Sequence, residues 1–240
     1  MRTPTHDPAL PALIACGHGT RGPAGRRALA RLRLDVAALR PGLQVVAASV
    51  DVQKPALPDV VARLADAGRR CVVVPLLLAA GYHVRVDVAG AVARSHGLAV
   101  ASAALGPDPA LVDVLVERLA ECGQQEGDTL VLGAAGSADP TAVAEVERVS
   151  RDLATRLGRP VTTGYLSGAA PSVPDAVRDA RTAGRPVTLA TFLLSPGYFA
   201  DLLATTAGAD RTSAPLAPHP ALAGLVLRRY DAALTRPVAP

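Results

Sequence analysis

The strongest constraint on the fold is that the sequence repeats itself. Four pairs of segments match in the same order along the chain: ACGHGTRGP at 15–23 with LGAAGSADP at 132–140, KPALPDVV at 54–61 with APSVPDAV at 170–177, PLLLAAGYHVRVDV at 75–88 with TFLLSPGYFADLL at 191–203, and LGPDPAL at 105–111 with LAPHPAL at 216–222. Four matching blocks in one order, the first three at offsets of 116 or 117 residues, indicate a duplicated structural unit. The repeat predicts two similar halves, residues 1–123 and 124–240, joined near the polar stretch CGQQEGD at 122–128.

Each half alternates short apolar runs with helical patterns. The runs are LIAC at 13–16, QVVAASV at 44–50, CVVVPLLLA at 71–79, TLVLGA at 129–134, PVTTGYL at 160–166 and PVTLATFLL at 186–194. Segments such as RRALARLRLDVAAL at 26–39 lie between them and have apolar residues at helical spacing. Strand, helix and strand in this rhythm predict an α/β protein with parallel sheets covered on both faces. Nearly continuous apolar strands agree with that burial.

Composition narrows the class of partner. The 25 Lys and Arg exceed the 21 Asp and Glu by only four, and no Arg-rich run with interleaved aromatics occurs, so we expect no nucleic-acid partner. Three scattered cysteines without zinc-type spacing are typical of a reducing compartment. The start, MRTPTHDPALPAL, lacks the apolar stretch of a secretory signal, and the longest apolar run, at 71–80, is too short to cross a membrane. We therefore expect a soluble, cytoplasmic monomer with no membrane partner.

The two halves differ at three positions that matter for chemistry. His18 corresponds to Ala135, Asp51 to Ser167 and His83 to Phe199, so potential metal-binding groups occur in the first half alone. His18, Asp51 and His83 each follow a predicted strand, and the carboxyl ends of parallel strands are where such sheets bind ligands. Each residue also has an ordinary interpretation: a histidine can be a hydrogen-bonded structural residue, and Asp51 can cap the helix near Pro55 or lie in a solvated turn.

Two imidazoles and one carboxylate suit a borderline divalent ion such as iron, cobalt or nickel, with open positions left for exchange. A histidine can also accept a proton near neutral pH. Arg21, Lys54 and Arg85 lie within a few residues of the three candidates, and their cations can bind the carboxylates of an anionic ligand. The alternative is that these three are ordinary solvated cations.

Three segments carry a resemblance to a known family. LIACGHGTRGP, SVDVQKPALPDVV and PLLLAAGYHVRVDV resemble successive signatures of the sirohydrochlorin chelatases of the SirB and CbiX type, and the resemblance covers nearly the whole chain. It implies a class II chelatase fold, two α/β halves facing each other across a central cleft, and metal insertion without ATP or an organic cofactor. The family's metal-binding histidines fall on His18 and His83. Its acid, usually Glu, falls on Asp51, whose shorter side chain leaves open whether it is a ligand, a proton acceptor or structural.

The resemblance also implies the substrates. Sirohydrochlorin, a tetrapyrrole with eight carboxylates, would lose two pyrrole protons as Fe²⁺ enters, and this lyase reaction would form siroheme. The second half would complete the cleft, with Tyr198 and Phe199 packing against the macrocycle and Tyr82 packing from the opposite side. The alternatives are insertion of Co²⁺ for cobalamin synthesis, and a noncatalytic carrier of metal or tetrapyrrole. His6, His96 and His219 receive no functional role.

Overall fold

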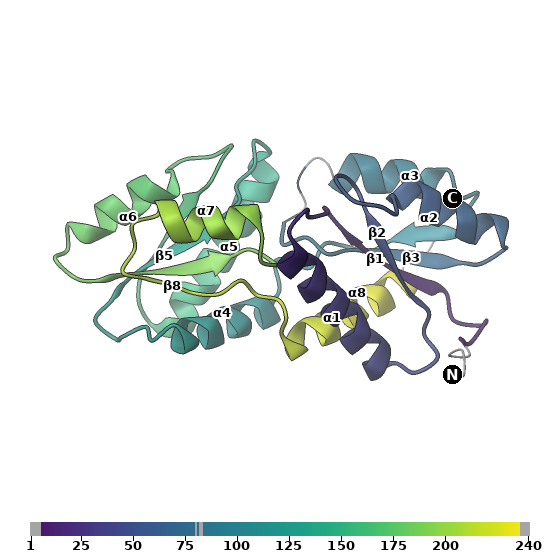
Figure 1. The fold of residues 1–240 in the computed structure, drawn as a ribbon, viewed down its shortest axis with the longest axis horizontal. Helices are drawn as coiled ribbons and strands as arrows, with labels where there is room; N and C mark the ends of the chain where they lie inside the picture. The colour runs from purple at the N-terminus through teal and green to yellow at the C-terminus, as the bar shows by residue number, and fades with distance from the viewer. Residues whose placement is uncertain (1–5, 80, 82–83, 236–240) are drawn as a thin grey trace.

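The computed structural model describes residues 6–79, 81 and 84–235, with the backbone alone for Val84 and Arg85. Within these residues the chain forms two lobes, each built on a four-stranded parallel sheet (Figure 1). The strand orders are β2-β1-β3-β4 and β6-β5-β7-β8, so the two sheets have the same topology. The predicted α/β class and the duplication are both confirmed.

The first repeat contains four strands and the helices that connect them. Its elements are β1 (Ala12–Gly17), α1 (Pro23–Leu39), β2 (Val45–Ser49), α2 (Leu57–Asp66), β3 (Cys71–Pro75), a π-helical turn η1 (Val84–Val88), α3 (Ala89–Ala93), β4 (Ala99–Ala101) and α4 (Pro109–Glu121). Every residue of β1 and β3 is buried, as their apolar sequences require.

The second repeat has the same order of elements. They are β5 (Thr129–Ala134), α5 (Pro140–Leu157), β6 (Val161–Tyr165), α6 (Val173–Arg181), β7 (Val187–Phe192), α7 (Tyr198–Thr206), β8 (Arg211–Thr212) and α8 (Pro220–Leu234). Proline at the first turn fixes the start of α4, α5 and α8, because a missing N–H costs nothing there. None of the described helices combines the length and the apolar character that a bilayer crossing would need.

Two details of the strands differ from the sequence prediction. The apolar run at 71–79 is a strand only as far as Pro75, whose ring removes a ladder donor. The edge strands β4 and β8 were not predicted, because they have three and two residues and so give too short a pattern to detect.

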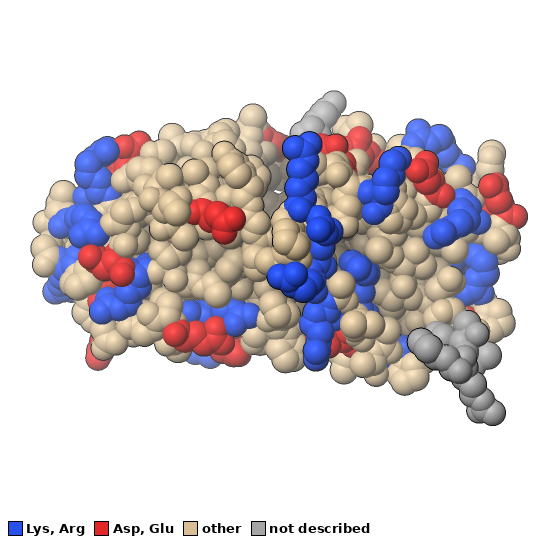
Figure 2. Space-filling view, in the orientation of Figure 1, with Lys and Arg blue, Asp and Glu red and all other residues tan. Residues whose placement is uncertain are grey.

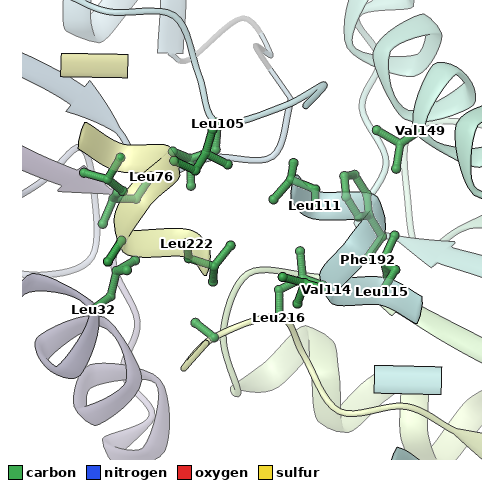
Figure 3. Packing of buried hydrophobic residues seen from close by; sticks show 14 of the residues in the cluster. Leu32, Leu76, Leu105, Leu111, Val114, Leu115, Val149, Phe192, Leu216 and Leu222 are labelled. Atoms are coloured by element: carbon green, nitrogen blue, oxygen red, sulfur yellow. The ribbon is translucent and has the colours of Figure 1, made fainter. Parts of the chain in front are cut away.

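The last helix of each repeat covers the sheet of the other repeat. α8 packs against α1 and β3 of the first repeat, whereas α4 packs against α5 and β7 of the second. One hydrophobic cluster therefore extends through both lobes. In Figure 3, Leu222 of α8 and Leu111 of α4 lie between Leu76 on one side and Phe192 on the other. The division at residues 123 and 124 follows the repeat, and the packing of these two helices crosses it.

Matched polar contacts hold the exchanged helices in place. Arg118 of α4 donates to the carbonyl of Leu216 at 3.1 Å, and Arg229 of α8 donates to the carbonyl of Leu105 at 2.7 Å. Arg229 is the repeat equivalent of Arg118, and Leu216 is that of Leu105, so one interaction is made twice around a pseudo-twofold axis.

A second matched pair explains His219. Its Nδ1 accepts from the N–H of Ala221 and caps α8, while its Nε2 lies 2.8 Å from the carboxylate of Glu117. In the equivalent pair, Asp108 caps α4 and lies 3.0 Å from Arg228, so the acidic and the basic residue exchange places. His219 is therefore a structural residue at the exchange of the two helices.

Candidate functional site

The carboxyl ends of the two sheets meet where the lobes join. A Cβ placed on Gly197, after β7, would lie 3.3 Å from Oγ1 of Thr20, after β1. The equivalent contact joins Gly81 and Ser137, at 3.7 Å. A side chain at Gly25 would come within 2.4 Å of the carbonyl of Pro196, so glycine is required there for the lobes to approach. The loops that carry the candidate residues therefore face the opposite lobe.

His18 and Asp51 lie on adjacent loops at this edge. The backbone N–H of Asp51 donates to the carbonyl of His18 at 3.0 Å, and both residues are exposed. The Asp51 carboxylate accepts a hydrogen bond from the N–H of Val52 at 2.7 Å, which agrees with the alternative that Asp51 lies in a solvated turn. It does not cap α2, whose N-cap is Ala56 and has no side-chain cap. The structure thus brings two of the three candidates together.

The turn beside Asp51 has a strained backbone. Val52 has φ of 54°, in the left-handed region that a β-branched residue rarely adopts. Gly168 occupies the equivalent position in the second half with φ of 71°, so the same turn is made there without strain. Backbone strain of this kind concentrates at functional sites, although it does not identify the function.

The second half keeps the loop geometry without the candidate side chains. The N–H of Ser167 donates to the carbonyl of Ala135 at 3.1 Å, as Asp51 does to His18. Ala135 and Ser167 are therefore structurally equivalent to His18 and Asp51. The loops around the pseudo-twofold axis are alike, and the candidate side chains His18 and Asp51 are present on one side of it.

The remaining candidates of the first half lie partly outside the described residues. His83 and Tyr82 are not described, and the Arg85 side chain is likewise outside them. In the described part of the chain, no group of three His, Cys, Asp or Glu side chains is close enough to hold a metal. The pairing of His18 with His83 stays a prediction.

The two described basic candidates are exposed. The Arg21 carbonyl accepts a hydrogen bond from Arg26 at 2.6 Å. Lys54 is 3.6 Å from Asp59, and both side chains are mostly in solvent, so this ion pair contributes little stability. Figure 2 shows Lys and Arg side chains gathered in a band across the middle of one face, where the lobes join and α1 begins. Such a band favours an anionic ligand.

An exposed aromatic pair begins α7 directly after Gly197. The Tyr198 side chain is 75 % exposed and that of Phe199 is 46 % exposed, and their rings meet edge to face with centroids 5.6 Å apart. Because a Cβ on Gly197 would lie only 3.3 Å from Thr20 Oγ1, these rings start from the same junction as the His18 loop. Exposed aromatics beside a junction of this kind offer a flat apolar surface to a ligand.

Cys16, two residues before His18, is not a ligand candidate. Burial, with a smaller contribution from the charge of Asp87, raises the pKa of its thiol to about 12. Metal ligation requires the thiolate, so Cys16 behaves as a small buried apolar side chain.

Sequence reasoning missed Gln53. Its side-chain oxygen accepts from the N–H of Thr20 at 3.3 Å and so ties the Asp51 loop to the His18 loop. No sequence pattern predicts this contact, because Gln53 lies in a turn without periodicity and Thr20 is 33 residues away.

The fold and these loops define the class of the protein: a two-lobed α/β protein whose candidate site lies at the facing carboxyl ends of two parallel sheets. The chain belongs to the CbiX family, the class II chelatases of the CbiX and SirB type. The family model matches it twice, over residues 12–122 and 129–233. Comparison with curated proteins gives no match.

Solved structures share the fold at low sequence identity. SirB from Bacillus subtilis with Fe³⁺ is 19 % identical with a TM-score of 0.78, covering 93 % of this chain and 95 % of that one. SirB from Bacillus subtilis subspecies spizizenii with cobalt is 18 % identical with a TM-score of 0.73, covering 94 % and 96 %. CbiX, the terminal enzyme of siroheme biosynthesis in denitrifying bacteria, is 21 % identical with a TM-score of 0.68, covering 93 % and 100 %.

Proposed function

We propose that the protein is a sirohydrochlorin ferrochelatase that inserts Fe²⁺ into sirohydrochlorin without ATP and forms siroheme. The observation that carries the proposal is the adjacency of the His18 and Asp51 loops at a sheet edge that faces the other lobe, in a chain of the CbiX family.

His18 and His83 would hold the metal and take part in removing the pyrrole protons. Neutral imidazole is a ligand for divalent iron and cobalt, and it is also a base near neutral pH. Two histidines leave coordination positions open, which a protein that must release its metal to the macrocycle requires. Asp51 would assist as a ligand or as a proton acceptor, since its carboxylate is exposed and its one described donor is the adjacent backbone N–H.

The substrate's carboxylates and ring would meet different parts of the site. Arg21, Lys54 and Arg85 would bind the peripheral carboxylates, and the band of cations at the lobe junction supports this assignment. Tyr198 and Phe199 would pack against the macrocycle from the second lobe, and Tyr82 from the first. The exposed rings of Tyr198 and Phe199 support that arrangement.

We favour iron over cobalt as the inserted metal. One SirB structure holds Fe³⁺ and the CbiX relative is an enzyme of siroheme biosynthesis, whereas another SirB structure holds cobalt. Imidazole and carboxylate ligands accept both metals, so Co²⁺ insertion is the second candidate.

The test mixes the purified protein with sirohydrochlorin under anaerobic conditions and follows the absorbance change with Fe²⁺ and with Co²⁺, each against a control without enzyme. We expect acceleration with both metals and a larger specificity constant for Fe²⁺. A larger constant for Co²⁺ would contradict the choice of metal. Binding of the tetrapyrrole without acceleration of either reaction would replace the chelatase by a carrier.

Variants connect the activity to the site. We expect His18→Ala and His83→Ala each to abolish insertion while the protein stays folded, because each removes a proposed ligand. His96→Ala is the matched control, since His96 is an exposed histidine outside the candidate site. Full turnover by both variants would refute the proposed site.

A further inference from the structure

A cavity of about 440 Å³ lies beside α1, next to the loops that carry His18 and Asp51, and Gly17 and Gln53 are part of its lining. It is bounded by α1, by the carboxyl ends of β1 and β2 and by residues 53–55. Its inner wall is apolar and includes Ala15, Ala47 and Leu76. Cavities of this volume are at the small end of those that bind ligands in proteins.

The second half shows what fills the equivalent space there. Ser49 lines the cavity, and the structurally equivalent residue is Tyr165: Ser49 is paired with Gly17 on β1 as Tyr165 is with Ala134 on β5. Both also form the same backbone bridge with the following segment: the N–H of Ser49 donates to the carbonyl of Pro55, as that of Tyr165 does to Pro171. Tyr165 is 1 % exposed, so its ring fills the space between sheet and helix in the second half.

The helix side of the cavity differs in the same way. The Tyr165 hydroxyl donates to the carboxylate of Glu147 on α5 at 2.6 Å. Ala30 takes the place of Glu147 on α1 and lines the cavity. Two large, mutually bonded side chains of one half are thus replaced by two small ones in the other. The cavity is the space that a phenol ring and a carboxylate would otherwise occupy.

The rim of the cavity is basic. Arg26, Arg27, Arg33 and Lys54 line it, and none of the described lining residues is acidic. Their second-half equivalents are Val143, Ala144, Ser150 and Ala170, so the positive charge is confined to the half that has the cavity. An apolar wall under a basic rim suits an organic anion, with the body against the wall and the carboxylates at the rim.

Arg33 differs from the other basic residues of the rim because its charge is half-buried and, among the described residues, unpaired. Its side chain is half-buried, and within residues 6–79, 81 and 84–235 it makes no hydrogen bond or ion pair. Burial lowers the pKa of Arg33 below its ordinary value, because the charged guanidinium has lost part of its hydration. A partly buried charged donor without an acceptor is costly, and a bound carboxylate would satisfy it.

We propose that this cavity is a second binding site, specific for a carboxylate-bearing group of about the size of one substituted ring, held by Arg33 with Arg26. Two ligands carry that chemistry: a free aromatic or cyclic organic acid, and one carboxylate-substituted ring at the edge of a tetrapyrrole. The second source rests on the proposed chelatase function, and the first does not.

The test titrates the full-length protein with phthalate, a benzene ring with two carboxylates, and with benzamide as the uncharged control, by calorimetry. We expect phthalate to bind and benzamide not to bind. Arg33→Gln should weaken phthalate binding by about tenfold, because a charge-assisted hydrogen bond is lost. The matched control is Arg31→Gln, on the solvent side of the same helix, where Arg31 pairs with Asp35.

A second variant fills the cavity as the other half does. Ala30→Glu with Ser49→Tyr should abolish phthalate binding, and its thermal unfolding shows whether it is folded. If that variant does not fold, Arg33→Gln decides the matter alone. Phthalate that binds no better than benzamide, or that binds Arg33→Gln as it binds the unmodified protein, would overturn the proposal.

Competition separates the two sources. Displacement of phthalate by metal-free sirohydrochlorin, together with weaker sirohydrochlorin binding by Arg33→Gln, would assign the cavity to one ring of the tetrapyrrole. Simultaneous binding of both ligands would assign it to a free organic acid. Failure of metal insertion with phthalate binding still dependent on Arg33 would refute the chelatase proposal and leave this site standing.

Discussion

Replacing Tyr230 by Phe removes one buried hydrogen bond between the two repeats. The Tyr230 side chain, on α8, is completely buried, and its hydroxyl donates to the carbonyl of Pro11 at 2.6 Å, just before β1. The ring stays in place, so little apolar burial is lost, whereas the buried carbonyl loses this donor. An acceptor left in that state costs about 1–3 kcal/mol. We expect the free energy of unfolding to fall by that amount.

Urea unfolding measures the loss, and hydrogen exchange with mass spectrometry locates it. Since one hydrophobic cluster extends through both lobes, peptides from β1 and from β5 should lose protection together. Tyr198→Phe is the matched control: it deletes the same oxygen from a side chain that is 75 % exposed and should change stability by less than about 0.5 kcal/mol. Unchanged stability in Tyr230→Phe, or loss of protection confined to β5, would refute the view that α8 holds the first sheet.

Three further predictions concern the candidate site and the lobe contacts. His18→Ala should weaken Co²⁺ binding at least about tenfold in an absorption titration, whereas His96→Ala should not, and equal affinities would contradict a ligand role for His18. Val52→Gly should raise the free energy of unfolding, measured in urea, by up to about 1 kcal/mol, because left-handed strain of about 1–2 kcal/mol exceeds the entropy cost of glycine. A loss of stability in this variant would contradict backbone strain at the Val52 φ of 54°. The hydrogen bond from Arg40, with a smaller Coulombic contribution, holds the pKa of Asp231 below its ordinary value. The pair therefore stabilises the fold at pH values above the unfolded carboxyl pKa of about 3.9. This stabilisation is lost as the pH falls through the lower pKa of the folded state. Asp231→Asn should therefore cost up to about 1 kcal/mol at pH 7, with the difference from the unmodified protein vanishing in strong acid, and a difference that persists there would contradict the ion-pair origin.

The sequence predicted more of the fold than of the site. Apolar runs of four to nine residues predicted β1, β2, β3, β5, β6 and β7, because a buried parallel strand is apolar along most of its length. The edge strands β4 and β8 escaped because a pattern of two or three residues is too short to recognise. The repeat also placed His18 and Asp51 at strand ends, which is where the structure has them.

The contacts of the site could not be predicted in the same way. Gln53 supports the His18 loop through one hydrogen bond to Thr20, and no periodicity marks such a residue. The cavity beside α1 corresponds to two differences between the repeats: Ser49 is equivalent to Tyr165, and Ala30 is equivalent to Glu147. These differences could be interpreted only once the structure showed that both positions face the same space.

The sequence by itself determined the duplication, the two parallel sheets and the half that carries the candidate histidines, because each of these follows from local pattern or from the comparison of aligned positions. The tertiary structure alone decided that α4 and α8 exchange sheets, since an amphipathic helix can pack its apolar face against either of two similar sheets. Contacts such as Arg118 with Leu216 and Arg229 with Leu105, made between residues distant in the sequence, select the exchanged arrangement. The same packing brings Thr20 against Gly197 and so sets the candidate site at the junction of the two lobes.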